Sequence, residues 1–400
     1  MGNDARRRRA LPGLRRLRTA APRLSQFALE HLLLLPLGAA IALVWVHVDP
    51  ERYFQFRYAA SFLVNDVAMV FFFALMTKEV VEATAPGGVL HSWRRALLPI
   101  AGAIGATIVP ALMHVRAVAA LDEPMLAAGW PIPFAVDIAF GYLVARIIFR
   151  RHPAIPFFIL LAIASNALGF GALALAQATG GLNLAGGVML LVIAMSIAGG
   201  LRRAGVKNFW AYLLTAGALS WFALFWSGLH PALALVPIVP FLPHGARDPG
   251  FLVEADPRAT DTLSRFEIWW RYPAQVALFF FGLVNAGVPI GAYEAGAWGL
   301  PIAVLVGKPI GLVIASGAAV LAGLRLPGNI GWRELTVVGF VAAIGFSVGL
   351  FFCAVLLPPG QLRSEMSMGV LLSLAGAPLA VVSAMLLGVG RFARQDTRHS

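Results

Sequence analysis

Long apolar stretches, separated by short polar segments, run along most of this chain. A transmembrane helix needs about 20 apolar residues, or fewer where the helix is broken. By that measure the chain contains twelve candidate spans, at about residues 27–48, 59–80, 96–115, 129–149, 154–177, 185–200, 208–226, 228–244, 270–289, 296–322, 335–357 and 367–390. The pattern predicts an all-α polytopic membrane protein with about twelve transmembrane helices. It also predicts that Pro301 and Pro309 break the span at 296–322.

Lysines and arginines are unevenly distributed between the two sides of this arrangement. If the N-terminus lies in the cytoplasm, 26 of the 31 basic side chains fall on the inner side and four on the outer side. The remaining one, Lys308, lies within a span. Cytoplasmic segments of membrane proteins are enriched in lysine and arginine. The distribution therefore predicts that both termini are cytoplasmic.

The beginning of the chain is a basic arm, in which eight arginines precede residue 24. Such a segment is attracted to anionic lipid at the cytoplasmic surface, and a twin-arginine export signal is the alternative interpretation. We divide the chain into this arm at 1–26, a transmembrane domain at 27–390 and a cytoplasmic tail at 391–400. The net charge of +12 resides mainly in the arm and the inner loops, so it does not indicate a nucleic-acid partner.

Composition narrows the function classes further. Hydrophobic residues make up 59% of the chain and charged residues 12%, whereas about a quarter of a soluble domain is charged. The single cysteine, Cys353, lies in an apolar run, so no intrachain disulfide can form. No histidine and cysteine cluster has the spacing of a zinc site, and no glycine-rich loop suits a phosphate. We expect neither a cofactor nor an enzymatic activity.

Two charged residues, Asp137 and Lys308, interrupt apolar spans. An ionisable group at the centre of a membrane helix costs about 2.5 to 3.5 kcal/mol, so such groups usually line a transport path. Pro131 and Pro133 precede the aspartate and should break its helix. Asp137 can therefore be part of an ion site, or a carboxylate neutralised by the dipole ends of a broken helix. Lys308 can carry protons or form a fixed ion pair.

The eleventh span contains small residues at positions that suit an interrupted helix or close packing between helices. These are Gly339, Gly345, Ser347 and Gly349. Interrupted spans at corresponding places in two halves of a transporter indicate inverted repeats with a central site. The fourth and eleventh spans are such counterparts.

Further polar residues surround the second span, with Asp66 deeper than Lys78, Glu79 and Glu82. The last three either form a solvated funnel or simply end the helix. His230 begins the eighth span. Because histidine titrates near neutrality it can sense pH, although a hydrogen-bonded histidine at a helix end is the interpretation we favour.

Seven motifs in order carry a resemblance to a known family. They read NDVAMVFFFALMTKEVVEA, LLPIAGAIGATIVPALM, GWPIPFAVDIAFGYL, SGLHPAL, VNAGV, VGKPIGL and AAIGFSVGLF. Over residues 59 to 357 the chain resembles the NhaA-type sodium/proton antiporters. The resemblance implies a bacterial inner-membrane transporter of a monovalent cation and a proton. It also implies crossed, broken helices four and eleven, a core domain that rocks against an interface domain, and a homodimer or larger membrane complex.

Motif positions transfer roles to individual residues. Asp137 matches the aspartate of the family's broken helix four, and Lys308 matches its intramembrane lysine. Glu79 and Glu82 match acidic positions of a cytoplasmic funnel, and His230 matches a histidine linked to pH response. The resulting ion or proton path consists of Asp137, Lys308, Asn166, Ser165 and Asp66, and the residues that break the helices are Pro131, Pro133 and Gly345.

One departure from the family pattern concerns the ion site itself. Where the family has two adjacent aspartates before Leu-Gly, this chain has Asn166 and Ala167, and a usual threonine is Val136. Asparagine offers a neutral oxygen but no titratable charge. We therefore predict that strong electrogenic exchange is absent. Three hypotheses follow: cation/proton antiport by Asp137, transport of an anion or neutral solute past Lys308, or a non-transporting interaction subunit. Lys308 can pair with Asp137, lose its proton or bind an anion in the central cavity, and of these three alternatives we favour the pair with Asp137.

Overall fold

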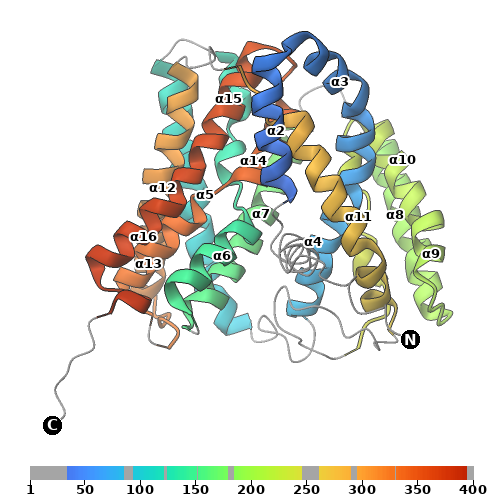
Figure 1. Ribbon diagram of the computed structural model, residues 1–400. Coiled ribbons are helices and arrows are strands. Elements are labelled where there is room, and N and C mark those ends of the chain that lie inside the picture. The colour runs from blue at the N-terminus through green and yellow to red at the C-terminus, as the bar shows by residue number, and fades with distance from the viewer. Residues whose placement is uncertain are drawn as a thin grey trace, which may run out of the picture.

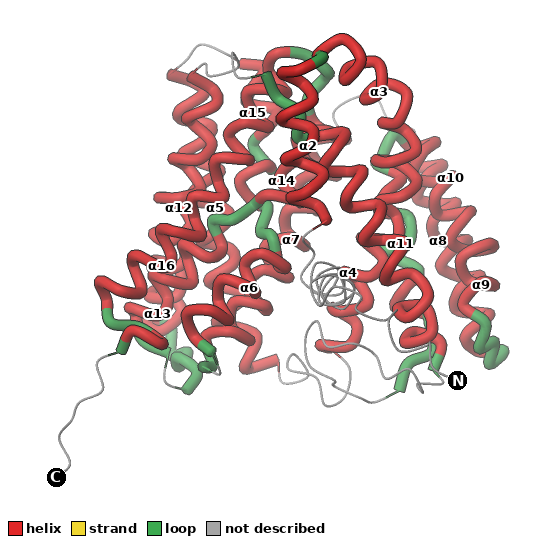
Figure 2. Tube along the Cα trace, in the orientation of Figure 1, coloured by secondary structure: helices red, strands yellow, loops and turns green. Residues whose placement is uncertain are grey.

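The computed structural model describes residues 34–84, 93–120, 124–150, 152–178, 184–245, 261–289, 295–328 and 330–393. Helices joined by short loops make up all of these ranges, and no strand occurs in them (Figure 2). The basic arm at 1–26 lies outside the described residues, as does the part of the C-terminal tail that follows residue 393.

The elements of the first half of the chain run from α2 to α8 (Figure 1). They are α2 (Leu34–Val48), α3 (Pro50–Phe62), the π-helical turn η1 (Leu63–Ala68), α4 (Met69–Thr84), α5 (Trp93–Ala120), the 3-10 turns η2 (Pro124–Gly129) and η3 (Ile132–Phe134), α6 (Ile138–Phe149), α7 (Ala154–Ala178) and α8 (Leu184–Arg203).

The remaining elements complete the bundle. They are α9 (Phe209–Tyr212), η4 (Leu213–Gly217), α10 (Ala218–Ser227), η5 (Pro231–Leu233), η6 (Val239–Phe241), α11 (Thr262–Asn285), α12 (Ala295–Leu321), α13 (Trp332–Ala342), α14 (Phe346–Leu356), α15 (Gln361–Leu372), η7 (Ser373–Ala375), α16 (Gly376–Leu387) and η8 (Gly390–Phe392).

Membrane-spanning segments dominate the part of the chain that the structure describes. Seven helical segments there are long and apolar enough to cross a membrane, and two bent pairs bring the number to nine if each pair is one span. The first pair joins residues 126–134 to α6 with a bend of 45°, and the second joins α13 to α14 with a bend of 47°. The all-α membrane fold and the broken fourth and eleventh helices are therefore confirmed.

Two expected details of the spans are wrong. The stretch 228–244 is not a spanning α-helix but a series of turns that includes η5 and η6, because four prolines between 231 and 243 remove backbone donors. In contrast, α12 continues through both Pro301 and Pro309. Membrane helices tolerate proline where neighbouring helices pack against the interruption, and Gly339 of α13 packs directly against Pro309.

The helices fall into two groups. The α12 group contains α5, α6, α7 and α12 to α16, and the α11 group contains α2, α3, α4 and α8 to α11 (Figure 1). Within the first group α5 and α12 touch backbone to backbone, because a side chain at Gly105 or Gly311 would overlap the other glycine's carbonyl oxygen. In the second group Gly38 of α2 approaches the backbone of α11 at Phe279 in the same way.

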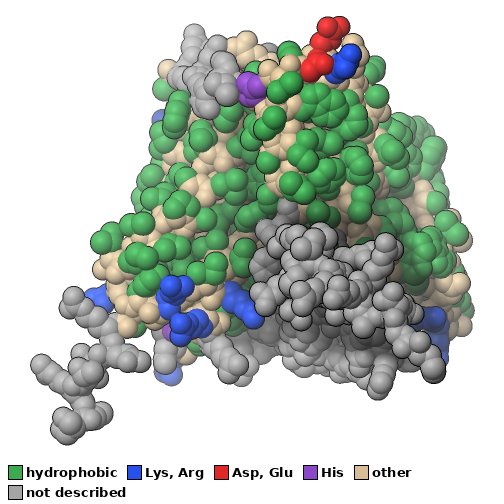
Figure 3. All heavy atoms as spheres, viewed as in Figure 1, with side chains coloured by type: hydrophobic (Ala, Val, Ile, Leu, Met, Phe, Trp, Pro, Cys, Tyr) green, Lys and Arg blue, Asp and Glu red, His purple; other side chains and the backbone are tan. Residues whose placement is uncertain are grey.

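The visible surface agrees with a membrane environment. Figure 3 shows hydrophobic side chains over the middle of the described surface, with basic side chains mainly near its lower edge. Exposed apolar residues such as Val44, Ile108 and Ile314 lie on the outside of this belt. Such a wide apolar surface suits contact with lipid rather than water.

Candidate functional site

The two broken helices cross at short non-helical segments, and the crossing builds the candidate site. The backbone N–H of Asp137 donates to the carbonyl of Ile344 at 2.7 Å, which ties one break to the other. Gly345 lies where the segments approach most closely. A Cβ atom at this position would lie 2.9 Å from the carbonyl oxygen of Ala135, so only glycine fits without moving backbone. Pro131 and Pro133 flank or lie in η3, the short turn before the crossing.

Asp137 lies between the N-terminal ends of two half-helices. One carboxylate oxygen accepts a hydrogen bond from the N–H of Phe140 at 3.0 Å, in α6. The other accepts from the N–H of Ser347 at 3.0 Å, in α14. Helix N-termini carry partial positive charge and bind anions. The side chain is only 2% exposed, so these two dipole ends compensate its negative charge inside the protein.

Lys308 lies at the same crossing, next to the C-terminal ends of the two helical segments that precede the breaks. Its ammonium donates hydrogen bonds to the carbonyl of Ala135, after η3, and to the carbonyl of Ala342 at 3.0 Å, at the end of α13. Helix C-termini present carbonyls without intrahelical partners and carry partial negative charge. The expected Lys308–Asp137 pair is therefore wrong. Among the described residues the fully buried ammonium is compensated by carbonyls, not by a carboxylate.

Asn166 of α7 holds the extended segment immediately before Asp137. Its side-chain oxygen accepts from the N–H of Val136 at 3.0 Å, and its NH₂ group donates to the carbonyl of Val136 at 2.9 Å. Ser165 does not take part in these contacts. It is fully buried, and its hydroxyl has no hydrogen-bond partner among the described residues. Thus Asn166 reaches the crossing and Ser165 does not.

A cavity of about 310 Å³ opens in front of Asp137. Residues of α2, α4, α6, α7, α11 and α14 line it. Asp137 is the only residue with an ionisable side chain among the described lining residues, whereas Asn166, Ser347 and Thr77 add neutral polar groups. Ala167 lines the cavity, but Lys308 does not. We call this space the Asp137 cavity.

Comparison with known proteins identifies the family. Residues 34–387 match the family model described as Na+/H+ antiporter 1. The chain belongs to this family. It is 38% identical to the Na(+)/H(+) antiporter NhaA 1 of Pelobacter propionicus over 363 residues, which cover 88% of this chain and 95% of that protein. It is also 38% identical to the Na(+)/H(+) antiporter NhaA of Desulfitobacterium hafniense over 372 residues, or 91% and 96% of the two chains.

The remaining residues that the family likeness indicated lie away from the crossing. Nδ1 of His230 accepts from the N–H of Ala232 at 3.3 Å and so caps η5. Its Nε2 is 3.7 Å from a carboxylate oxygen of Asp66, in η1. Because Nδ1 accepts a hydrogen bond, the neutral ring carries its proton on Nε2, facing Asp66. Neither residue lines the Asp137 cavity.

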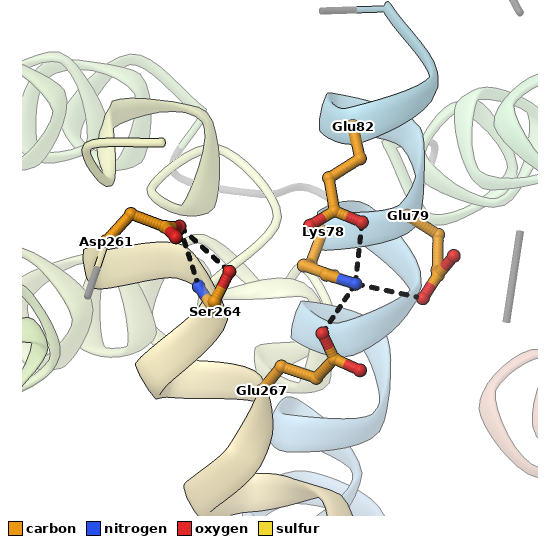
Figure 4. A network of polar contacts seen from close by, with 6 residues as sticks. All are labelled: Lys78, Glu79, Glu82, Asp261, Ser264 and Glu267. Atoms are coloured by element: carbon orange, nitrogen blue, oxygen red, sulfur yellow. Dashed lines mark hydrogen bonds and ion pairs between the residues drawn. The ribbon is translucent and has the colours of Figure 1, made fainter. Parts of the chain in front are cut away.

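A second polar cluster joins α4 to α11 in this antiporter family member. Lys78 lies 2.6 Å from Glu82, 2.6 Å from Glu267 and 3.3 Å from Glu79, as measured from its nitrogen to their nearest carboxylate oxygens (Figure 4). These side chains are largely buried, and the four residues form a packed ion-pair network. Sequence reasoning missed Glu267, because nothing in its local pattern places it opposite Lys78.

The end of α11 beside this network is also fixed by side chains. Asp261 caps the helix by accepting from the N–H of Ser264 at 3.1 Å and from its hydroxyl at 2.9 Å (Figure 4). Such an N-cap contributes about 1 kcal/mol to a helix. The capped helix start positions Glu267 toward α4.

Proposed function

We propose that this protein is a proton-coupled antiporter of monovalent cations in a bacterial inner membrane, and that Asp137 alone exchanges the proton and the cation. The supporting observation is the placement of this carboxylate. It is buried, it is held by two helix N-termini, and it faces the Asp137 cavity as the one ionisable side chain among the described lining residues. A buried charge inside a membrane protein usually marks the transported ion's route.

A single exchanging carboxylate determines the charge balance of the cycle. The carboxylate holds either one proton or one monovalent cation, so each turnover exchanges one positive charge for another. Lys308 does not need to release a proton when the cation binds, because carbonyl groups compensate its charge in place. The proposed exchange is therefore electroneutral, in agreement with the substitution of Asn166 and Ala167 for two carboxylates.

The neutral ligands of the bound cation would come from the same crossing. The Asn166 side-chain oxygen accepts one hydrogen bond from Val136, and a carbonyl oxygen has two lone pairs. It can thus face a cation in the cavity while it holds the backbone. In this proposal Asp137 and Asn166 move together with α6 and α7, relative to α2, α4 and α11, which also line the cavity. Rocking the first set against the second would expose Asp137 to each side of the membrane in turn.

The orientation in the membrane and the partners belong to the same proposal. Both termini lie in the cytoplasm, and the basic arm at 1–26 contacts anionic lipid. The protein forms a homodimer or part of a larger membrane complex. Transport of an anion past Lys308 gains no support, because Lys308 does not line the Asp137 cavity.

Proton flux in proteoliposomes tests the function. Vesicles with an acidic interior and a pH-sensitive dye receive sodium, lithium or potassium chloride from outside, with the membrane voltage either clamped at zero or left free. We expect cation-dependent alkalinisation at the same rate in both conditions, and its loss in Asp137→Asn. Ser165→Ala serves as a control. A wild-type protein that moves no protons with any monovalent cation would leave the non-transporting subunit as the remaining interpretation, and a rate that depends on voltage would contradict electroneutral exchange.

A further inference from the structure

The lining of the Asp137 cavity is mostly aromatic and aliphatic. Four phenylalanines contribute to it: Phe72 and Phe73 from α4, Phe140 from α6 and Phe170 from α7. The rings of Phe73 and Phe170 pack edge to face, with centroids 5.1 Å apart, and Phe72 meets Phe73 in a similar geometry at 5.3 Å. In this conformation an aromatic wall, built by helices of both groups, lines the space in front of the carboxylate.

The supply of oxygen ligands is small for a metal ion. Hard metal cations require several oxygen atoms in their first shell. Besides Asp137, the described lining residues offer side-chain oxygens only from Thr77, Asn166 and Ser347. The Thr77 hydroxyl donates to the carbonyl of Phe73 at 2.8 Å, which fixes its rotation, and the Asn166 oxygen keeps one lone pair beside the hydrogen bond that it accepts from Val136. Ala167, which adjoins Asn166 on the cavity wall, adds no oxygen.

The size of the cavity also exceeds what one bare metal ion fills. Its 310 Å³ corresponds to about ten water molecules at the volume of liquid water. Pockets for small organic ligands begin at about this size, with apolar walls and a few placed polar groups. The Asp137 cavity matches that description, since a single buried carboxylate lies among phenylalanine, leucine, isoleucine and valine side chains.

We infer that the preferred substrate is a small organic ammonium ion, such as a quaternary alkylammonium, which Asp137 pairs electrostatically while the phenylalanine wall contacts its alkyl groups. This inference rests on the proposed exchange function and specifies its substrate class. Aromatic rings attract cations through the electron-rich faces of their π-systems, and proteins bind quaternary ammonium groups in this manner. Such an ion needs no shell of oxygen ligands, so the limited oxygen supply is no disadvantage.

Selectivity in the proteoliposome assay tests the inference. The probe is tetramethylammonium chloride, which cannot cross the bilayer as a neutral base, compared with sodium chloride at equal ionic strength. We expect half-maximal proton release at about tenfold lower tetramethylammonium than sodium, which is the effect of one or two desolvated cation–π contacts. Equal or weaker action of tetramethylammonium would overturn the inference while leaving sodium/proton exchange intact.

Variants identify the wall as the cause. Phe73→Leu and Phe170→Leu keep apolar volume but remove a ring, so both should raise the half-maximal tetramethylammonium concentration several-fold with little effect on sodium. Phe222→Leu, at an exposed position of α10 outside the cavity, is the matched control. Ala167→Asp adds an oxygen ligand and should shift the preference toward sodium. Equal changes for both cations in the two ring variants would also contradict the inference.

A binding measurement separates this inference from the proposed function. In detergent, tetramethylammonium should raise the thermal unfolding temperature of the wild type more than sodium does, and the difference should disappear in Asp137→Asn. If the probe stabilises the protein but no cation moves protons, the substrate class holds and the exchange function fails. If neither stabilisation nor flux occurs with the probe, the substrate class is wrong.

Discussion

The side-chain amide of Asn166 forms hydrogen bonds with both backbone polar groups of Val136. The oxygen accepts at 3.0 Å and the NH₂ group donates at 2.9 Å. Backbone groups in an extended segment between two half-helices lack helical partners, and a buried unpaired group costs about 1–3 kcal/mol. An amide offers a donor and an acceptor side by side at every pH, whereas a carboxyl group does so only when it is protonated. Asn166 therefore holds the backbone that presents Asp137.

Substitution of Asn166 should destabilise the protein even where no ion is bound. In its ionised form Asn166→Asp keeps the acceptor but loses the donor to the Val136 carbonyl, and Asn166→Ala loses both. We expect a loss of about 1–3 kcal/mol for the aspartate and a larger one for the alanine, measured as thermal unfolding in detergent. Ser165→Ala is the matched control, since the adjacent buried hydroxyl has no hydrogen-bond partner in the described structure. Equal stability of Asn166→Asp and the wild type would show that Asn166 does not hold the Val136 backbone.

Lys308 should contribute to stability through carbonyl groups and not through Asp137. Lys308→Met leaves the carbonyls of Ala135 and Ala342 without this donor. Each buried carbonyl that loses its hydrogen bond should cost about 1–3 kcal/mol of stability. Lys308→Gln, which can still donate, should be less harmful. Because the aspartate is not the partner, Asp137→Asn should not rescue Lys308→Met. Recovery of stability in the double variant would restore the ion-pair hypothesis.

Gly345→Ala should disturb the crossing. Its new methyl group would lie 2.9 Å from the carbonyl oxygen of Ala135, a backbone atom that cannot rotate away. Forced overpacking of this kind costs about 1–3 kcal/mol. Gly171→Ala in α7 has open space around the new atom and should be neutral or slightly stabilising. Both unfolding temperatures can be measured in one detergent. A harmless Gly345→Ala would mean that the two breaks are less closely packed than described.

The Lys78 cluster should depend on its cation. Removal of one partner from a buried ion pair costs about 3–5 kcal/mol, because the remaining charges stay uncompensated. We expect a loss of this order for Lys78→Met, and partial recovery when Glu267→Gln removes one of the carboxylates. Arg52→Met removes a basic residue from the exposed pair with Asp49 and should cost less than about 1 kcal/mol. If Lys78→Met cost no more stability than Arg52→Met, the ion-pair network would be contradicted.

The sequence was sufficient to predict the elements that depend on local chemistry. Pro131, Pro133 and Gly345 mark the two helix breaks because a missing donor or a missing side chain acts at its own position. Asp137 was recognised as an unusual charge in an apolar span for the same reason. The long apolar stretches also predicted the all-α membrane fold, which the family membership supports.

Pairings across the fold could not be predicted in the same way. Lys308 finds its partners at Ala135 and Ala342, and no side-chain property of alanine indicates a free carbonyl. Glu267 approaches Lys78 only because α11 packs against α4. The continuous helix through Pro301 and Pro309 depends on packing by neighbouring helices, so the local tendency of proline to break a helix did not decide the outcome. Where a contact is made by backbone, or by distant helices, the sequence alone carries little information.

The backbone contact between Gly105 and Gly311 has a consequence for the response to membrane potential. With no side chains between them, α5 and α12 cannot slide past each other without losing the contact, and Lys308 lies on α12 only three residues before Gly311. The ammonium is thus fixed within the α12 group of helices, the group that also bears Asp137. In the proposed cycle that group carries the same net charge whether it holds a proton or a cation. Voltage then acts equally on the proton-loaded and the cation-loaded forms, so its effects cancel over a full cycle and only the two concentration gradients set the direction of exchange.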